Sequence, residues 1–172
     1  MNERELVDLL RLVRHDTLNQ IQLLQGYLTL GRTEKVRQLL DEWIKNAREE
    51  ANLSNLNCPR MAAFFLTYKF QDYSPILHVT VKGEGKFSDE QDRIFSTWFK
   101  RFFDRIEQLV TKGKENYIKV AIEMQPEPVF YITWSGETFT KDDFQELFQE
   151  QHEVLLSQTE FAENYFFLEL TI

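Results

Sequence analysis

Residues 3–30, ERELVDLLRLVRHDTLNQIQLLQGYLTL, decide how the N-terminal part of this chain folds. Apolar side chains recur in this stretch every three or four residues, which is the period of one face of an α-helix. The spacing therefore predicts a long amphipathic helix of about 40 Å, at about 1.5 Å per residue. The side chains that define the apolar face are Leu6, Leu10, Val13, Ile21, Leu24 and Leu28.

A second helix is predicted directly after the first. Gly31 suits a helix C-terminus and Thr33 suits an N-cap, and the same apolar spacing continues from Val36 to Ala51. Residues 1–56 should therefore form a helical hairpin. Its apolar surface is wider than one seam, because it also includes Leu9, Leu12, Leu18, Leu23, Leu39 and Ile44. Pairing two hairpins into a dimeric four-helix bundle would bury this surface, and the alternative is that the hairpin lies on the rest of its own chain.

Residues 57–172 are predicted to form a second module of the α+β class. Pro59 is placed to open a helix that ends before Pro75, and Ser88 with Gln91 has the spacing of a capping box. Residues 118–124 and 130–134 alternate between apolar and polar types, as a hairpin with one buried face does. We expect an α/β sandwich of about four strands with two or three helices on one side. The remaining elements are expected at 76–81 (strand), 88–111 (helix), from 140 (helix) and 166–172 (strand).

Composition narrows the class of protein and its partners. The 172 residues carry a net charge of −8, most of it in residues 57–172, which disfavours binding to nucleic acid or to an anionic membrane. Cys58 is the only cysteine, so neither an intramolecular disulfide nor a cysteine-based zinc cluster can form within one chain. The N-terminus resembles neither a signal peptide nor a membrane span, and we expect a cytoplasmic protein.

His15 is the candidate for chemistry. At about 100° per residue it lies about 200° from Val13, so it should point into water rather than into the buried stripe. A solvated imidazole is largely neutral at pH 7 and can attack phosphorus through nitrogen, whereas a plain surface histidine would need no function. The row of residues that shares this face is Asp8, Arg11, His15, Asn19, Gln22 and Gly26.

The stretch from Arg14 to Leu28, RHDTLNQIQLLQGYL, resembles the phosphoacceptor helix of the sporulation initiation phosphotransferase B family, which is related to the dimerisation helices of two-component sensor kinases. The pattern R-H-D-x-x-N-x-x-Q-x-x-x-G-x-L is matched at every fixed position. Leu53-Ser54-Asn55-Leu56 at the end of the hairpin also resembles the family.

The resemblance implies a homodimeric phosphotransferase of the phosphorelay that initiates sporulation. His15 would take a phosphoryl group from an aspartyl-phosphate of one response regulator and pass it to an aspartate of another, with Mg²⁺ held by the regulator and no cofactor held by this chain. Asp16 would orient or electrostatically support His15, Asn19 would contact the docked regulator or the phosphoryl group, and Arg14 would offset phosphate charge. The regulator would dock on Arg11, Leu18, Gln22 and Gly26.

The order of the two modules also resembles that of an ATP-dependent sensor histidine kinase. The second module departs from the kinase pattern at the positions where kinases bind nucleotide. Residues 102–107 read FFDRIE in place of an Asn-rich box, and residues 133–137 read TWSGE where kinases place an aspartate before a glycine. Gly83-Glu84-Gly85 is interpreted as a tight turn. We therefore expect a degenerate kinase-like domain without a nucleotide site.

Other candidate residues have simpler interpretations. His78 and His152 have no second ligand at metal-binding spacing, and the carboxylate pairs Glu49-Glu50 and Asp142-Asp143 are expected to be solvated helix faces. The phenylalanines of residues 88–111 and Cys58 are expected to be structural. The remaining alternative is a non-catalytic dimeric scaffold that binds two-component proteins and in which His15 is merely exposed.

Overall fold

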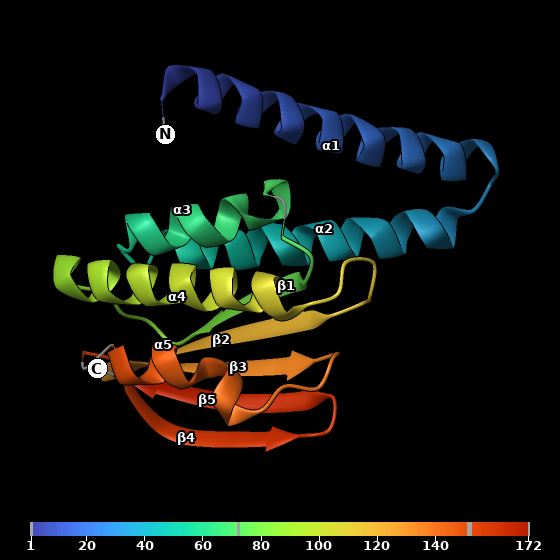
Figure 1. The fold of residues 1–172 in the computed structure, drawn as a ribbon. Coiled ribbons are helices and arrows are strands. Elements are labelled where there is room, and N and C mark those ends of the chain that lie inside the picture. The colour runs from blue at the N-terminus through green and yellow to red at the C-terminus, as the bar shows by residue number, and fades with distance from the viewer. Residues whose placement is uncertain (1, 72, 151–152, 172) are drawn as a thin grey trace. The chain divides into compact units, whose positions relative to one another are not determined.

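The structure is a computed structural model that describes residues 2–71, 73–150 and 153–171. The chain divides into two compact units after Glu50 (Figure 1). Leu53 and Leu56, which we assigned to the hairpin, are buried in the core of the second unit. Their burial explains why the compact units divide before Leu56.

The first unit is the expected helical hairpin. Helix α1 (Glu3–Thr29) begins with a capping box, in which the Glu5 amide donates to Asn2 Oδ1 over 3.0 Å and the Asn2 amide donates to Glu5 Oε2 over 2.9 Å. Gly31 has a φ of +66°, a conformation that glycine adopts without strain, and α2 (Thr33–Ser54) follows at once. The turn therefore forms where Gly31 and Thr33 predict it.

The hairpin leaves much of its apolar surface uncovered. Of the 27 residues of α1, all within the described part of the chain, none is buried. The half-buried apolar side chains of the hairpin are Leu9, Leu24, Tyr27, Val36, Leu39 and Trp43. Beside this seam, α1 carries a row of five large apolar side chains that are 39% to 54% exposed, which we call the apolar row: Leu6, Leu10, Val13, Ile21 and Leu28.

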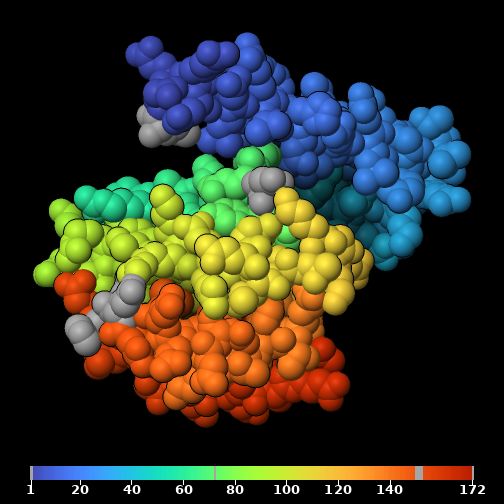
Figure 2. All heavy atoms as spheres, viewed as in Figure 1, coloured from blue at the N-terminus to red at the C-terminus, as the bar shows by residue number. Residues whose placement is uncertain are grey.

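The second unit is a two-layer α+β structure. Its five strands have the order β1-β2-β3-β5-β4, in which β1 is parallel to β2 and every other pair is antiparallel. The helices cover one face of the sheet, with α3 beside α4 (Figure 1), and Figure 2 shows all heavy atoms in the same view. The strands are β1 (Ile76–Lys82), β2 (Tyr117–Gln125), β3 (Glu127–Ser135), β4 (Leu155–Ala162) and β5 (Tyr165–Thr171). The helices are α3 (Pro59–Thr67), η1 (Tyr68–Phe70), α4 (Asp89–Leu109), η2 (Lys141–Phe144) and α5 (Gln145–Glu150).

Alternation of apolar and polar residues decides which face of each strand is buried. Ile118, Val120 and Ile122 of β2 point to the helical layer, and the next residue on either side is polar or less buried. In α4, Phe95, Phe99, Phe102 and Phe103 are 0% exposed, so the phenylalanine-rich helix is core, as expected. Ser88 and Gln91 form the predicted capping box of α4.

The expectation of about four strands is wrong, because the sheet has a fifth strand. Strand β4 lies at the edge of the sheet and pairs only with β5 in the described structure. Its register against β5 shifts between Leu156 and Gln158. Buried and exposed residues do not alternate regularly along its sequence, LLSQTEFA, as they do in β2 and β3. An irregular edge strand has no clear periodic signal, which is why the sequence did not reveal it.

Asp92 of α4 caps the N-terminus of the neighbouring helix α3. Its carboxylate is 0% exposed and accepts hydrogen bonds from the backbone amides of Arg60 (3.0 Å) and Met61 (2.9 Å) in the first turn of α3. The Arg60 guanidinium lies 3.5 Å from the same carboxylate. Burial, reinforced by the negative charge of Asp92, raises the pKa of the Cys58 thiol to about 11, in keeping with a structural cysteine.

The substitution Asp92→Ala should destabilise the protein by about 2 to 4 kcal/mol, because it leaves two amide donors at a buried helix end without an acceptor. Asp92→Asn keeps one acceptor oxygen and should lose about half as much. Urea unfolding of both variants measures the difference. Equal stability of Asp92→Ala and the wild type would show that the cap contributes nothing.

Candidate functional site

The candidate site in the first unit is the exposed face of α1 that carries His15. All six residues of the predicted row, from Asp8 to Gly26, are exposed. By helical geometry this face lies on the far side of α1 from the hairpin seam. The ring of His15 is therefore accessible to another protein. Arg14 and Leu18 are also exposed, and Asp16 is half-buried.

Hydrogen bonds link members of the row one turn apart. The Asn19 amide nitrogen Nδ2 lies 3.2 Å from His15 Nδ1. On the preceding turn, Arg11 donates to Asp8 Oδ1 over 2.8 Å, which orients the guanidinium toward that carboxylate. These contacts come from i,i+3 and i,i+4 spacing on one helix, so the sequence spacing was sufficient to place the residues together.

Gly26 is not required by packing within the described chain. A Cβ atom built on it would meet no heavy atom within 4 Å, apart from its neighbours and the backbone of its own helix. Glycine in the middle of a helix costs about 0.5 to 1 kcal/mol relative to alanine. The glycine therefore exposes bare helix backbone at the end of the row without a structural benefit to the chain itself.

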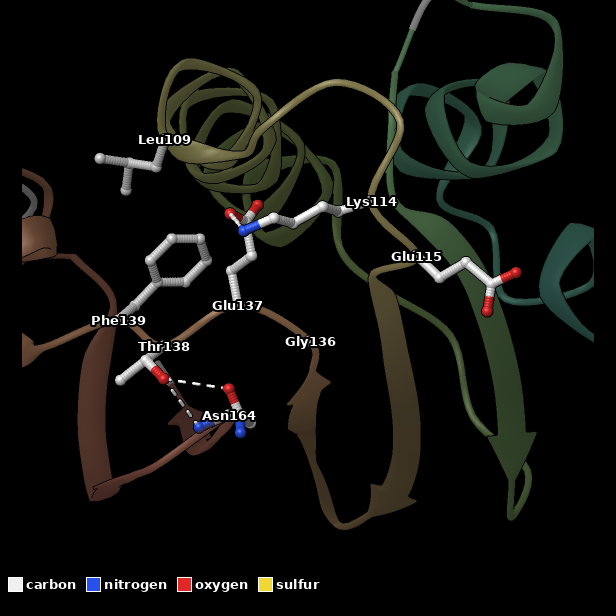
Figure 3. A pocket seen from close by; sticks show the side chains of 8 residues that line it. All are labelled: Leu109, Lys114, Glu115, Gly136, Glu137, Thr138, Phe139 and Asn164. Carbon is white, nitrogen blue, oxygen red and sulfur yellow. Dashed lines mark hydrogen bonds and ion pairs between the residues drawn. The ribbon is translucent and has the colours of Figure 1, made fainter.

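The second unit has a polar hollow of about 570 Å³ beside the end of β3 (Figure 3). Gly136 and Glu137, from the stretch 133–137 that departs from the kinase adenine-binding pattern, lie in its wall. The residues that line the hollow therefore decide whether this unit can hold a nucleotide there. Its lining residues are Leu109, Lys114, Glu115, Gly136, Glu137, Thr138, Phe139 and Asn164.

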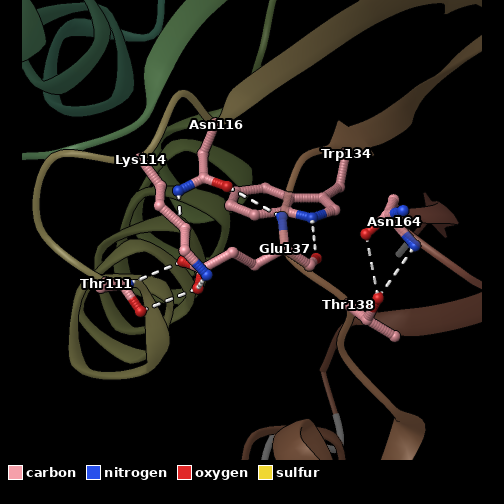
Figure 4. A network of polar contacts seen from close by, with 7 residues as sticks. All are labelled: Thr111, Lys114, Asn116, Trp134, Glu137, Thr138 and Asn164. Atoms are coloured by element: carbon pink, nitrogen blue, oxygen red, sulfur yellow. Dashed lines mark hydrogen bonds and ion pairs between the residues drawn. The ribbon is translucent and has the colours of Figure 1, made fainter.

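The Glu137 carboxylate is held by the loop that follows α4 (Figure 4). It accepts hydrogen bonds from the Thr111 amide (2.7 Å), the Thr111 hydroxyl (2.8 Å) and Lys114 Nζ (2.8 Å). Its backbone amide donates to Asn116 Oδ1 over 2.9 Å, and its carbonyl accepts from Trp134 Nε1 over 2.7 Å. The ion pair with Lys114 and the bond from the Thr111 amide lower the Glu137 pKa to about 2.

The carboxylates of α4 at the kinase-box position are also engaged. Asp104 accepts from the Tyr73 hydroxyl over 2.9 Å, and Glu107 accepts from the Ser74 amide and hydroxyl over 2.7 and 2.8 Å. Phe102 and Phe103, which precede them, are core. A nucleotide would therefore face a fixed carboxylate and a lysine already paired, and residues 102–107 offer no amide side chain, so these residues do not fit a nucleotide.

Glu137→Gln should be less stable than the wild type at pH 7. A lowered pKa means that the carboxylate stabilises the fold above its ordinary value of 4.5 and loses this effect as pH falls toward 2. The stability difference should therefore shrink below pH 4.5 and vanish near pH 2. Urea unfolding across this range measures it, and Lys114→Met should show the same trend. A difference that is independent of pH would contradict the ion pair.

The other histidines and Asp143 belong to the second part of the chain, residues 51–172. His78 is exposed on β1, and His152 lies outside the described residues. Asp143 accepts from the Thr140 amide over 2.7 Å and so caps η2. Among the described residues no group of three or more His, Cys, Asp or Glu side chains is arranged to hold a metal ion. None of the described helices is long and apolar enough to cross a membrane.

Two family models together match the whole chain. Residues 1–56 match the model "Sensor kinase SpoOB-type, alpha-helical domain", and residues 57–172 match "Sporulation initiation phospho-transferase B, C-terminal". The chain belongs to the sporulation initiation phosphotransferase B family. The resemblance read from residues 14–28 is thereby confirmed, and with it the class of activity, a phosphotransferase of the sporulation phosphorelay.

This chain is similar to one curated protein and, more distantly, to several solved kinases. It is 28% identical over 152 residues to sporulation initiation phosphotransferase B of Bacillus subtilis (strain 168), which covers 87% of this chain and 79% of that protein. The blue-light activated histidine kinase of Erythrobacter litoralis EL346 aligns with a TM-score of 0.47, 10% identity and coverage of 100% of this chain and 60% of the kinase. Histidine kinase ThkA, solved in complex with response regulator TrrA, aligns with a TM-score of 0.43, 14% identity and coverage of 98% and 63%.

Proposed function

We propose that His15 carries the phosphoryl group in this sporulation phosphotransferase, within a cytoplasmic homodimer. The ring would accept phosphate from an aspartyl-phosphate of one response regulator and pass it to an aspartate of a second. One observation carries the proposal: in a chain of a phosphotransferase family, His15 is exposed on α1 at the second position of the family pattern of residues 14–28.

For this chemistry, the main requirement on this chain is that it positions a nucleophile. A lone pair of the imidazole forms a bond to phosphorus while the bond from phosphorus to the aspartate oxygen breaks, and the regulator's carboxylate leaves with that electron pair. Phosphoryl transfer of this kind depends mainly on alignment and charge neutralisation, and Mg²⁺ would be supplied by the regulator. Arg14 would offset phosphate charge and Asp16 would support the charge of the ring. The regulator would dock on the exposed residues Arg11, Leu18, Gln22 and Gly26.

The apolar row supports dimerisation through α1. Its five members are 39% to 54% exposed in the single chain, and they lie beside the seam rather than on the His15 face. A large exposed apolar strip on a helix marks an interaction surface. A second hairpin packed on this row would complete a four-helix bundle and leave both His15 rings accessible.

The second unit supports a donor other than ATP. The Glu137 carboxylate, Lys114 and the carboxylates of α4 are committed to internal contacts, and the geometry does not fit a nucleotide. Nothing in the described contacts favours the kinase alternative. The role that remains for this unit is to support the hairpin or to contact the regulators.

The substitution Gly26→Ala should change the stability of the protein and its rate of phosphoryl transfer in opposite directions. Alanine fits the open space at this position and should stabilise the helix by about 0.5 to 1 kcal/mol. Transfer from a regulator should nevertheless slow, because the added methyl group stands on the docking face. Thermal unfolding and transfer kinetics measure the two effects, and Gln25→Ala on the same helix is a matched control. Faster or unchanged transfer in Gly26→Ala would remove Gly26 from the docking surface.

The test of the proposed function compares two phosphate donors. A phosphorylated single-domain response regulator with Mg²⁺ and no ATP should label this protein, and the label should be lost in acid, as expected for phosphohistidine. ATP with Mg²⁺ and no regulator should give no label. Labelling from ATP alone would instead establish a kinase, and no label from either donor would favour the scaffold.

A further inference from the structure

Strand β4 leaves one edge of the sheet without a partner strand. Among the described strands it pairs with β5 alone, and no other element of the second unit lies beyond it in Figure 1. Along an edge strand, alternate residues direct their backbone donors and acceptors away from the sheet, where another extended chain can pair with them. We infer that β4 is a docking edge, and that it accepts as an added strand a segment of a partner protein in which basic and apolar side chains alternate. This surface does not depend on the role proposed for His15.

The second half of β4 is regular enough to pair with another strand. The register shift of this strand lies between Leu156 and Gln158, and from Gln158 to Ala162 every residue pairs in step with β5. Natural edge strands are commonly protected from further pairing by proline, by lysine or by a bulge. Residues 158–162, QTEFA, contain neither of these residue types and no register shift. They therefore offer an unprotected backbone edge.

The opposite edge of the sheet, strand β1, differs in charge. Its last residue is Lys82, whose Nζ lies 3.1 Å from Glu123 Oε1 on β2. A lysine on an edge strand disfavours pairing with another chain, because the added strand would have to accommodate its charge. Of the two edges, β4 is thus the one without this protection.

The charge around β4 indicates a basic partner. Residues 142–172 contain eight carboxylate side chains and no lysine or arginine, so this segment accounts for the whole net charge of −8. Glu160 on β4 and Glu163 in the turn after it are exposed, and within the described part of the chain neither is paired with a basic side chain. Like charges oppose a second copy of the same edge, whereas lysine or arginine beside Glu160 would form a favourable cross-strand pair.

The margin of the hydrophobic core indicates why apolar side chains should alternate with the basic ones. Leu156 and Phe161 of β4 and Phe148 of α5 pack against the core but are only half-buried. The Phe161 ring lies 6.0 Å from the ring of Phe144, which is fully enclosed, so the core ends at this edge. Successive side chains of a strand point to opposite faces, so Phe161 and Glu160 face opposite ways. An added strand would cover Phe161 with one face and meet Glu160 with the other.

The test uses the full chain and a blocked peptide of about seven residues, the length of a strand, in which lysine and valine alternate. Amide hydrogen exchange followed by NMR locates the binding site. With saturating peptide, amides of alternate residues in 158–162 should exchange at least about tenfold more slowly, and those of β1 should not change. The same peptide with alternate amides N-methylated should bind at least about tenfold more weakly, because it lacks donors to β4.

A charge reversal on the protein tests the specificity of the edge. Glu160→Lys should bind the lysine–valine peptide about three- to tenfold more weakly than the wild type, and should bind a glutamate–valine peptide more tightly by a similar factor. Glu84→Lys is the matched control, because Glu84 is also exposed and the change in net charge is the same. It should bind both peptides as the wild type does.

Three results would overturn the inference. Equal binding of the N-methylated peptide, or equal effects of Glu160→Lys and Glu84→Lys, would show only general attraction to an acidic protein. Protection of the β4 amides that rises with protein concentration in the absence of peptide would show that a second copy occupies the edge. Labelling of His15 by a regulator is a separate measurement, so failure of the proposed function would leave the outcome at β4 unaffected.

Discussion

Replacing His15 with Gln should abolish acceptance of phosphate from a response regulator, with a loss of at least about a thousandfold in rate. Glutamine keeps a polar, hydrogen-bonding side chain of similar reach but has no nucleophilic ring nitrogen. The side chain at this position is exposed, so the free energy of unfolding should change by no more than about 0.5 kcal/mol. Labelling from a phosphorylated regulator with Mg²⁺ measures the first effect, and urea unfolding measures the second.

The matched control for this loss is an exposed residue of the same helix outside the row, and Gln25→Leu serves that purpose. It should accept phosphate as the wild type does. Acid-labile label on His15→Gln would contradict the assignment of His15. A His15→Gln protein that retained full activity in the relay would favour the scaffold alternative.

Introducing charge into the apolar row should convert the protein to a monomer. Leu10 and Ile21 are 54% and 42% exposed and lie on one side of the hairpin seam. Burying such a side chain contributes about 1.5 to 3 kcal/mol, and a dimer would bury each position twice. The double substitution Leu10→Glu with Ile21→Glu should therefore weaken association by at least about a thousandfold.

Sedimentation or light scattering measures this effect. The wild type should have twice the chain mass of 20.6 kDa at micromolar concentration, and the variant should have the mass of one chain. Leu12→Glu with Leu23→Glu, each 48% exposed on the other side of the seam, is the matched control and should dissociate less. A monomeric wild type would contradict the proposed dimer, and the hairpin would then cover a surface of its own chain.

The site on α1 was predictable because all of its residues belong to one helix. Helical geometry alone places Asn19 one turn from His15 and puts both opposite Val13. The contact between Asn19 Nδ2 and His15 Nδ1 agrees with that placement. A prediction from the local period of apolar residues does not depend on tertiary contacts.

The network around Glu137 was not predictable from the sequence. Thr111, Lys114 and Asn116 lie in the loop between α4 and β2, and Glu137 follows β3, so the contacts depend on how two loops meet at one end of these strands. The sequence signalled only that Gly136-Glu137 departs from the kinase pattern. The buried cap from Asp92 to α3 was missed for the same reason, because its partners are 31 and 32 residues away.

The sequence by itself determined the two long helices, the turn at Gly31, the face that carries His15 and the α+β character of residues 57–172, because each follows from the local period of apolar residues. Only the tertiary structure decided the fifth strand, the membership of Leu53 and Leu56 in the second core and the commitment of Glu137 to Lys114. Edge pairing, core membership and ion pairing depend on residues distant in the chain. Their energies arise only when those residues are brought together by folding.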